Sequence, residues 1–362
     1  MKLNFKIVKA ESLKSFCIKV LRKLNVPLED AEITADVIVS ADLKGIESHG
    51  IARLNRYVKR LANGWIKPES KITILKETPI TLLIDAENSL GQVAAYKAMK
   101  LCINKAEKNY LGVAVVKNSN HFGIAGYYAM MALEKDMIGV CMSNASPLVL
   151  PTFSIEPMLG TNPIAIAVPK KYEPPLVLDM ATSTVSMGKI ELYKRLNKLL
   201  PAVWAINEKG EVEFNPEKVI NCAYKLKRGG LLPLGGLAET SGYKGYGLAL
   251  IIDVLTGVLS GAAYGPYVGE PNDSKPSNIG HFLAAININA FMDINEFKER
   301  VNDLISIIKK ASKAEGCDRI YIPGEKEWEI EEQRRRNGVP ISMEILENLE
   351  NLAKKFNIEF SL

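Results

Sequence analysis

The spacing of apolar residues predicts that the chain begins with three helices. Between residues 13 and 24, leucine, phenylalanine and valine recur at intervals of three or four positions, which places them on one helical face. A second helix is predicted over residues 28–45 and a third over residues 51–62. Ser48 and His49 lie in the turn between them.

From about residue 71 the pattern alternates between strands and helices. Short runs rich in valine and isoleucine predict strands, and amphipathic helices are predicted over residues 90–108 and 124–134. The predicted strands cover residues 71–77, 80–86, 112–117, 138–143, 163–168, 176–181 and 282–288. This alternation predicts an α/β domain.

The last part of the chain is mainly helical again, with amphipathic patterns over residues 296–310 and 343–356. Neither terminal set of helices forms a convincing core by itself, so we expect the two ends to pack together. The predicted organisation is a helical domain made of residues 1–70 with 290–362, and an α/β domain made of residues 71–289.

Composition excludes several classes of function. Charged residues make up 24% of the 362 residues, and lysines alternate with acidic residues instead of forming the basic stripe that nucleic acid requires. No apolar run approaches the roughly 20 residues that span a bilayer. Residues 1–14 contain neither an apolar signal core nor a small-residue cleavage site, so we expect a cytoplasmic protein.

Cysteine usage supports the same compartment. The five cysteines are widely spaced, and they form neither a CxxC pair nor a zinc-ligand pattern. We therefore expect no disulfide framework and no metal site, and a reducing environment. The scarcity of glutamine beside abundant lysine, glutamate and isoleucine favours a thermophilic source.

Histidine is the commonest general acid or base near neutral pH, and this chain has only three. His49 lies in a turn, and Arg53 follows four residues later. An arginine can hold a carboxylate through two parallel hydrogen bonds while a neighbouring histidine moves a proton on the adjacent carbon's oxygen. The spacing therefore suits a 2-hydroxy acid, although a loop histidine beside a solvated arginine has the same spacing.

The other polar candidates each have two interpretations. His121 precedes a predicted helix, where Gly123 and Gly126 suit an anion near free amides, or simply shape a turn. Asp179 ends a predicted strand, where it could orient a histidine or cap the next helix. His281 begins a strand, and we expect it to be structural.

Standard nucleotide-binding patterns are missing. No GxGxxG motif follows a strand, and the segment GYGLAL from Gly245 shares two glycines with that motif but lacks the preceding strand. The P-loop pattern GxxxxGK[ST] is also absent. The residues alone therefore indicate acid–base chemistry on an acidic metabolite, without a standard cofactor loop.

Seven ordered blocks resemble the type 2 malate/L-lactate dehydrogenase family, which also includes L-sulfolactate dehydrogenase, ureidoglycolate dehydrogenase and diketogulonate reductase. The blocks are ADLKGIESHGIARLNRYV, IDAENSLGQV, VVKNSNHFGIAGYYA, MLGTNPIAIAVP, LVLDMATSTVSMGK, YKGYGLAL and IPGEKEWEIEEQRRRNGVPI. They span roughly residues 10–345, and they look most like archaeal malate dehydrogenases.

The resemblance implies an α/β fold with a non-Rossmann, L-sulfolactate dehydrogenase-like cofactor domain that contains a mixed sheet, plus a helical domain made from both chain ends. The cofactor would be NAD or NADP. Residues 334–336 are three arginines that could meet a 2′-phosphate, although a solvated helix face is favoured. The resemblance also implies a homodimer whose active-site cleft is completed by the second subunit.

The resemblance also implies roles for individual residues. Ser48 and His49 match catalytic residues, Asp179 would complete a proton relay, and His121 matches a second histidine close to the substrate and the nicotinamide. For the substrate, the resemblance implies contacts from Arg53, Tyr57 and Ser146. For the cofactor, it implies contacts from His121, Phe122, Gly123, Ile124, Ala125, Thr161, Leu178, Asp179, Met180, Lys244, Gly245, Gly324, Glu325 and Lys326.

The expected reaction is hydride transfer between NAD(P) and a small (S)-2-hydroxy acid, with malate and oxaloacetate as the favoured pair. Lactate, sulfolactate and cyclic ketimine carboxylates are the alternatives, and a non-enzymatic metabolite-binding module is disfavoured because binding alone requires no proton relay. Three departures bear on the substrate. This chain lacks a Gly-Gly pair found in many relatives before LGTNP, Tyr243 stands where several relatives have His or Pro, and Ser146 lies where relatives vary.

Overall fold

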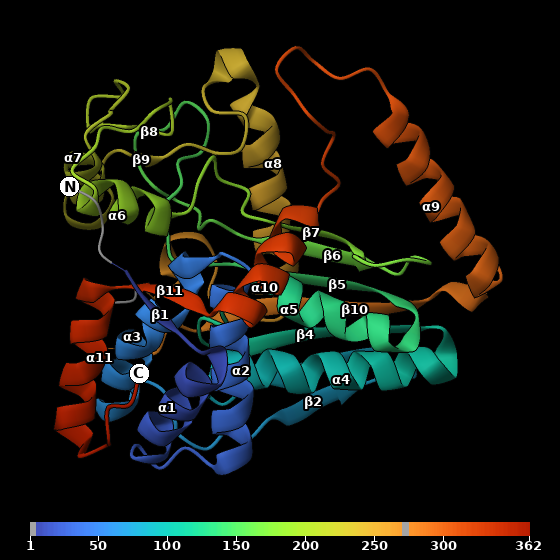
Figure 1. Cartoon of the computed structure of the whole chain (residues 1–362), viewed down its shortest axis with the longest axis horizontal. Coiled ribbons are helices and arrows are strands. Elements are labelled where there is room, and N and C mark those ends of the chain that lie inside the picture. The colour runs from blue at the N-terminus through green and yellow to red at the C-terminus, as the bar shows by residue number, and fades with distance from the viewer. Residues whose placement is uncertain (1–4, 270–274) are drawn as a thin grey trace.

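The computed structural model describes residues 5–269 and 275–362, and a seven-stranded mixed sheet lies at its centre (Figure 1). The strand order is β2-β3-β4-β10-β5-β6-β7. The strands are β2 (Thr73–Glu77), β3 (Thr81–Asp85), β4 (Leu111–Ser119), β5 (Met137–Ser143), β6 (Ile164–Val168), β7 (Leu176–Met180) and β10 (Ile279–Asn287). β3 and β4 run parallel, and the other neighbours run antiparallel. The predicted α/β fold with a mixed sheet is confirmed.

Two helices pack on this sheet through small residues. α4 (Gly91–Asn109) and α5 (Ala125–Met131) bury alanines against the central strands. A Cβ atom at Gly112 would lie 1.9 Å from the carbonyl oxygen of Cys102 in α4, and one at Gly139 would lie 2.0 Å from that of Ala129 in α5. Glycine is therefore required where each helix crosses the sheet.

Segments from both ends of the chain share one buried core. It contains the apolar faces of α1 (Ala10–Arg22), α2 (Leu28–Leu43), α3 (Leu54–Ala62) and α11 (Met343–Phe356). The short strands β1 (Phe5–Val8) and β11 (Val339–Ser342) pair antiparallel beside it. This strand pair was not predicted, because a strand of four residues is too short to show a period of apolar positions.

The remaining elements surround these two cores. They are α6 (Met187–Arg195), β8 (Ala205–Ile206), α7 (Pro216–Asn221), β9 (Gly230–Leu231), α8 (Gly242–Asp253), α9 (Ile294–Lys310) and α10 (Glu325–Asn337). α9 forms ion pairs with Asp136 and Lys171 of the α/β part, and it contributes no residue to the core of the two chain ends. The domain boundaries near residues 70 and 290 stay a prediction.

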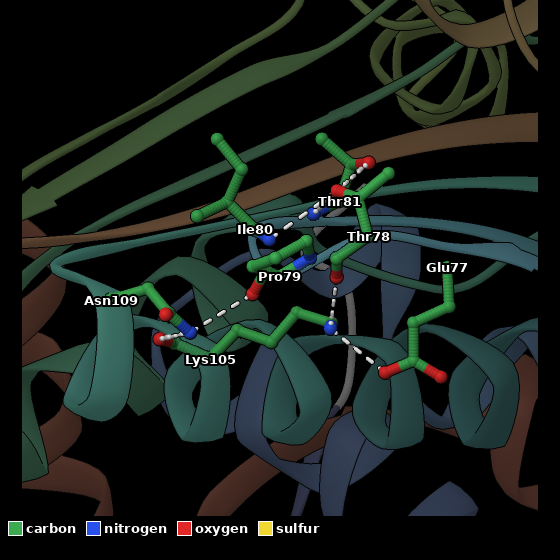
Figure 2. A network of polar contacts seen from close by, with 7 residues as sticks. All are labelled: Glu77, Thr78, Pro79, Ile80, Thr81, Lys105 and Asn109. Atoms are coloured by element: carbon green, nitrogen blue, oxygen red, sulfur yellow. Dashed lines mark hydrogen bonds and ion pairs between the residues drawn. The ribbon is translucent and has the colours of Figure 1, made fainter.

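The turn between β2 and β3 is fixed to α4 by polar contacts, which Figure 2 shows. Lys105 donates from Nζ to the Glu77 carboxylate at 2.8 Å and to the carbonyl oxygen of Thr78 at 2.6 Å. Asn109 donates from Nδ2 to the carbonyl oxygen of Pro79 at 3.0 Å. The last turns of α4 therefore hold the edge of the sheet in place.

Within the described residues, no helix is long and apolar enough to cross a membrane. All five cysteines have free thiols, and four of them are buried. The same part of the chain contains no cluster of three or more histidine, cysteine or acidic side chains that could hold a metal ion.

Candidate active site

A cavity of about 510 Å³ lies where the helical core meets the sheet. Its wall combines the segment before α3, the turn before α5, the end of β7 and the start of α6. Polar side chains on this wall include Ser48, His49, Arg53, Arg56, His121 and Asp179. Three of the predicted motifs, more than 50 residues apart in sequence, therefore meet at one place.

A buried carboxylate shapes the turn that carries His49. The turn consists of two 3₁₀ segments, Glu47–His49 and Ile51–Arg53, separated by Gly50. The Ile51 amide donates to Asp42 Oδ2 at 2.6 Å, and a Cβ atom at Gly50 would lie 1.9 Å from Asp42 Oδ1. Glycine is thus needed so that this carboxylate can approach the backbone.

The two cavity histidines are held by neighbouring hydroxyl groups. Ser48 Oγ lies 2.8 Å from Nδ1 of His49, and the Tyr57 hydroxyl lies 2.7 Å from Nδ1 of His121. The two imidazole rings are nearly parallel, at 16°, with their centroids 5.4 Å apart. In each ring Nδ1 is engaged, so Nε2 is the nitrogen left for a ligand.

The surroundings keep both imidazoles neutral at pH 7. Burial, followed by the positive charges of Arg53 and Arg56, lowers the pKa of His49 to about 4. Burial and then the charge of Arg56 lower the pKa of His121 well below its ordinary value. A neutral imidazole can accept a proton, as the oxidation of an alcohol requires.

Two arginines at the start of α3 line the cavity. Arg53 directly precedes α3, donates from Nε to the carbonyl oxygen of Ser48 at 2.6 Å, and has its Nη2 3.2 Å from a carboxylate oxygen of Glu191. Arg56 follows three residues later, within α3, and burial lowers its pKa to about 10. The Arg56 guanidinium therefore remains charged at neutral pH.

Asp179 is on the wall, but it contacts neither histidine. Its Oδ2 accepts a hydrogen bond from the Gly126 amide at 2.8 Å, and no hydrogen bond joins it to His49 or His121 within the described chain. Burial raises the pKa of Asp179 to about 6. Because β7 ends directly beside α5, the Gly126 amide at the start of that helix donates to Asp179. This amide is therefore not free for an anionic ligand, contrary to the expectation from the sequence.

A second cavity of about 350 Å³ adjoins the first, and Ile46, Ile124 and Asp179 line both. Its walls are largely apolar and include Pro175, Val177, Tyr321 and Trp328. Ten predicted cofactor residues line the two cavities: His121, Gly123, Ile124, Ala125, Thr161, Leu178, Asp179, Met180, Gly324 and Lys326.

Four predicted cofactor residues line neither cavity. Phe122 is buried and stacks on the His281 ring at 4.6 Å. Gly245 packs against the backbone of Leu234, Lys244 is exposed on α8, and Glu325 is paired with Lys309. Phe122 and Glu325 adjoin residues that do line the cleft, whereas no residue of the segment YKGYGLAL, which contains Lys244 and Gly245, lines either cavity.

Two of the three predicted substrate residues line the first cavity, and the third does not. Arg53 and Ser146 line the first cavity, and the Ser146 hydroxyl donates to the carbonyl oxygen of Gly269 at 2.8 Å. Tyr57 is not part of the wall, because it is 1% exposed and lies behind His121, which its hydroxyl contacts. It is therefore placed to orient that histidine.

His281 has the structural position that we expected. It is fully buried, with Nδ1 lying 2.9 Å from Ser143 Oγ and Nε2 lying 2.7 Å from Ser119 Oγ. The arginines of residues 334–336 all pair with glutamates, and none of them lines either cavity of the cleft. In this structure they form a helix face whose guanidinium groups pair with glutamates.

The residues of the first cavity that the sequence reasoning did not assign include Arg56, Lys189 and Tyr224. Arg56 had a signal, because it follows Arg53 by three positions and so shares its helical face. Lys189 ends the block LVLDMATSTVSMGK, which marked the segment but not this residue. Tyr224 lies in the π-helical turn Cys222–Leu226, which becomes part of the wall only through folding.

The residues present suit a dinucleotide. Two adjoining cavities offer space for two halves of one ligand, one with apolar walls and one with the histidines. The backbone of Gly123 has a φ of 86°, and a Cβ atom there would lie 2.7 Å from Val37 Cγ1, so glycine is required in the turn that follows His121. The cleft can therefore bring a bound cofactor next to a proton donor and an anion-binding guanidinium.

The chain is similar to known dehydrogenases over nearly its whole length. The family described as Malate/L-lactate dehydrogenase matches residues 8–350. Malate dehydrogenase of Pyrococcus abyssi is 46% identical over 357 residues, covering 98% of this chain and 96% of the relative. L-sulfolactate dehydrogenase of Methanocaldococcus jannaschii is 41% identical, with coverages of 97% and 98%. The solved structure of malate dehydrogenase from Pyrococcus horikoshii OT3 superposes with a TM-score of 0.90 at 44% identity, covering 99% of this chain and 98% of that one.

Proposed function

Because the chain belongs to the malate/L-lactate dehydrogenase family and is a 2-hydroxy acid dehydrogenase, we propose that it interconverts malate and oxaloacetate. Dehydrogenases of this family use a nicotinamide cofactor, and here we propose NAD or NADP. The observation that carries the proposal is the placement of His49 and Arg53 on one cavity wall, four residues apart. These groups match the hydroxyl and the carboxylate that a 2-hydroxy acid carries side by side.

His49 moves the proton in the proposed mechanism. Ser48 holds Nδ1 at 2.8 Å, which fixes the ring and leaves Nε2 to accept the proton of the substrate hydroxyl. His49 is neutral at pH 7 because burial lowers its pKa, so it is ready to act as a base during oxidation. In the reverse direction its protonated form donates to the alkoxide oxygen. His121, supported by Tyr57, is the second candidate for this role.

Arg53 binds the carboxylate at C1 of the substrate. Its guanidinium lines the cavity, and its Nη2 is held 3.2 Å from the carboxylate of Glu191, which is not on the cavity wall. The fork of the guanidinium fixes the plane of the carboxylate and so orients the neighbouring carbon. Binding and orientation by Arg53 thus precede proton transfer by His49.

The cofactor, when bound, supplies or receives the hydride. The residues that would hold it are the ten predicted ones that line the cleft, from His121 to Lys326. Asp179 lies where the two cavities join, and we propose that it takes part in the proton relay through a group of the bound ligand, since no hydrogen bond within the described residues joins it to His49 or His121. Apolar side chains such as Val177 exclude water from the far half of the cleft.

A substrate screen tests the proposal directly. Oxaloacetate, pyruvate, sulfopyruvate and piperideine-2-carboxylate would each be offered with NADH and with NADPH, and kcat/KM would be measured for every pair. We expect oxaloacetate to give the highest value. A higher value for sulfopyruvate or for the cyclic imine would reassign the substrate, and cofactor binding without turnover of any of the four would refute the enzymatic role.

We also propose that the protein is a homodimer in which the second subunit completes the cleft. An exposed apolar face supports this proposal. It consists of Leu250 and Ile251 on α8, Val254 and Val258 on the π-helical turn Val254–Val258, and Leu259 directly after that turn. Each of the five side chains is between 41% and 57% exposed. We call these five residues the α8 face. Apolar surface of this kind marks contact sites between proteins.

Two further proposals concern the setting of the protein. We propose that it works in the cytoplasm, and the five free cysteines support a reducing compartment. We propose a thermophilic source on the basis of composition, because lysine and glutamate are abundant while glutamine occurs only at residues 92 and 333.

A further inference from the structure

The two arginines on the cavity wall differ in what they contact. Arg53 is engaged on both sides, by the carbonyl oxygen of Ser48 and by the carboxylate of Glu191. Arg56 also lines the cavity, yet no carboxylate within residues 5–269 and 275–362 pairs with it. The wall therefore holds one guanidinium with a counter-ion and one without.

A cation in such surroundings is costly unless an anion compensates it. Burial lowers the pKa of Arg56 to about 10, and the neighbouring positive charge of Arg53 acts in the same direction. The group is nevertheless charged at neutral pH. An anion that enters the cavity would neutralise Arg56 and recover part of the energy lost on burial.

Both guanidinium groups line the same cavity as the two stacked histidine rings, whose centroids lie 5.4 Å apart. Both positive charges lower the pKa values of His49 and His121. A substrate bound beside these rings therefore meets two positive charges, and within the described residues only Arg53 has a paired carboxylate.

We propose that Arg56 binds a second anionic group of the substrate, at the end remote from the carboxylate that Arg53 holds. The substrate class is then a 2-hydroxy acid with two acidic groups, either a dicarboxylate or a carboxylate with a sulfonate. Lactate, which has one acidic group, would leave the Arg56 charge uncompensated. This inference rests on the proposed function and adds the residue that selects the substrate.

The guanidinium group is suited to this task. Its planar fork can donate two parallel hydrogen bonds to a carboxylate or a sulfonate, and it stays charged at every pH at which the enzyme would work. Arg56 lies in the first turn of α3 and Arg53 caps the start of that helix, so the backbone fixes the spacing between the two anion-binding groups. A substrate that spans this spacing is held at both ends, with its reacting carbon beside the histidines.

The test compares oxaloacetate, sulfopyruvate and pyruvate in wild type, Arg56→Gln and Arg56→Lys. A hydrogen-bonded charge pair corresponds to roughly 10- to 100-fold in affinity. We expect Arg56→Gln to lower the ratio of kcat/KM for oxaloacetate to that for pyruvate by about this factor. The ratio for sulfopyruvate to pyruvate should fall similarly, whichever of the two acids is the better substrate. Arg56→Lys keeps the positive charge but loses the planar guanidinium group. Its kcat/KM ratios should therefore lie between those of wild type and those of Arg56→Gln.

Two further variants serve as controls. Arg53→Gln should lower kcat/KM for every substrate by a similar factor, because each substrate carries a carboxylate at C1. Lys59→Gln removes one positive charge from the exposed side of the same helix and should leave the ratios unchanged. Circular dichroism and thermal unfolding would establish that each variant is folded.

The outcomes separate the two proposals. Unchanged ratios in Arg56→Gln, with wild type active on the keto acids, would overturn the role of Arg56 and leave the proposed function standing. If Arg56→Gln does not fold, unchanged ratios in Arg56→Lys would have the same meaning. A wild-type protein that turns over none of the three acids would overturn the proposed function and this inference together.

Discussion

At the scale of single residues, His49 is the group on which the proposed chemistry depends. Replacing it with alanine should lower kcat by about 10²- to 10⁴-fold, which is the range for a positioned general acid or base. The side chain lines a cavity and is only half-buried, so the melting temperature should change little. Steady-state kinetics on the folded variant measures the effect. Turnover close to that of wild type would remove His49 from the role, and a larger loss in His121→Ala would transfer the role to His121.

Asp42 makes stability depend on pH in an unusual direction. Burial raises its pKa to about 7, and the hydrogen bond from the Ile51 amide opposes this shift only in part. The folded protein therefore binds this proton more tightly than the unfolded chain does. The contribution of Asp42 to the free energy of unfolding is greatest below pH 4 and declines as the pH rises to about 7.

We therefore expect Asp42→Asn to gain stability relative to wild type as the pH rises from 4 to 8, because asparagine does not ionise. The difference in melting temperature between the two proteins, measured across this range, checks the prediction. Asp303→Asn is the matched control, since that carboxylate is exposed on α9. A difference that stays constant, or that shrinks as the pH rises, would contradict the assignment.

The scale of elements concerns how helices and strands are fixed to one another. Lys105 connects α4 to the turn between β2 and β3 through one carboxylate and one carbonyl oxygen (Figure 2). Replacing it with methionine keeps most of the side chain's length but removes both polar contacts. We expect a loss of about 1 kcal/mol in the free energy of unfolding, because the contacts are partly exposed.

Urea denaturation of Lys105→Met, with Lys108→Met as the control on the exposed side of α4, measures this loss. Turnover should remain unchanged in both variants, because neither lysine lies on the wall of the cleft. Equal stabilities for the two variants would show that the contacts in Figure 2 do not contribute.

The predictions made from the periodicity of hydrophobic residues were most accurate for the helices and strands. All seven predicted strands of the central sheet form, and in β5 the alternate residues Met137, Gly139 and Cys141 are buried. The pair formed by β1 and β11 was missed, because it joins two four-residue segments at opposite ends of the chain. Short segments carry too few positions for a period to be recognised.

At the scale of the whole molecule, the α8 face is the feature that the single chain leaves uncovered. We expect Ile251→Glu to place a charge in the proposed dimer interface and so to separate the subunits. Light scattering should then report a mass near 39.9 kDa in place of about twice that value. Activity should fall with dimer content if the second subunit completes the cleft.

Leu28→Glu is the control for this experiment, since Leu28 is 53% exposed at the start of α2 and outside the α8 face. It should leave the mass unchanged. A wild-type protein that is already monomeric at assay concentration, yet fully active, would refute the homodimer and its completed cleft.

The sequence by itself determined the pieces of the site that depend on local spacing. Ser48, His49 and Arg53 fall within six residues, so a turn followed by a helix is enough to bring them near one another. The order of the motifs was also sufficient to indicate the family. Arg56 could have been predicted on the same grounds, because residues three apart share a helical face.

Only the tertiary structure decided which of these groups meet and what surrounds them. His49 and His121 are 72 residues apart and stack because the helical core packs against the turn before α5. Phe122 and Gly245 adjoin cofactor motifs, yet packing directs them into the core. Burial, which lowers the pKa of His49 and raises that of Asp42, likewise has no local signal. The burial of a side chain depends on all its contacts with segments that are distant in the sequence. A local pattern of residues therefore does not predict it.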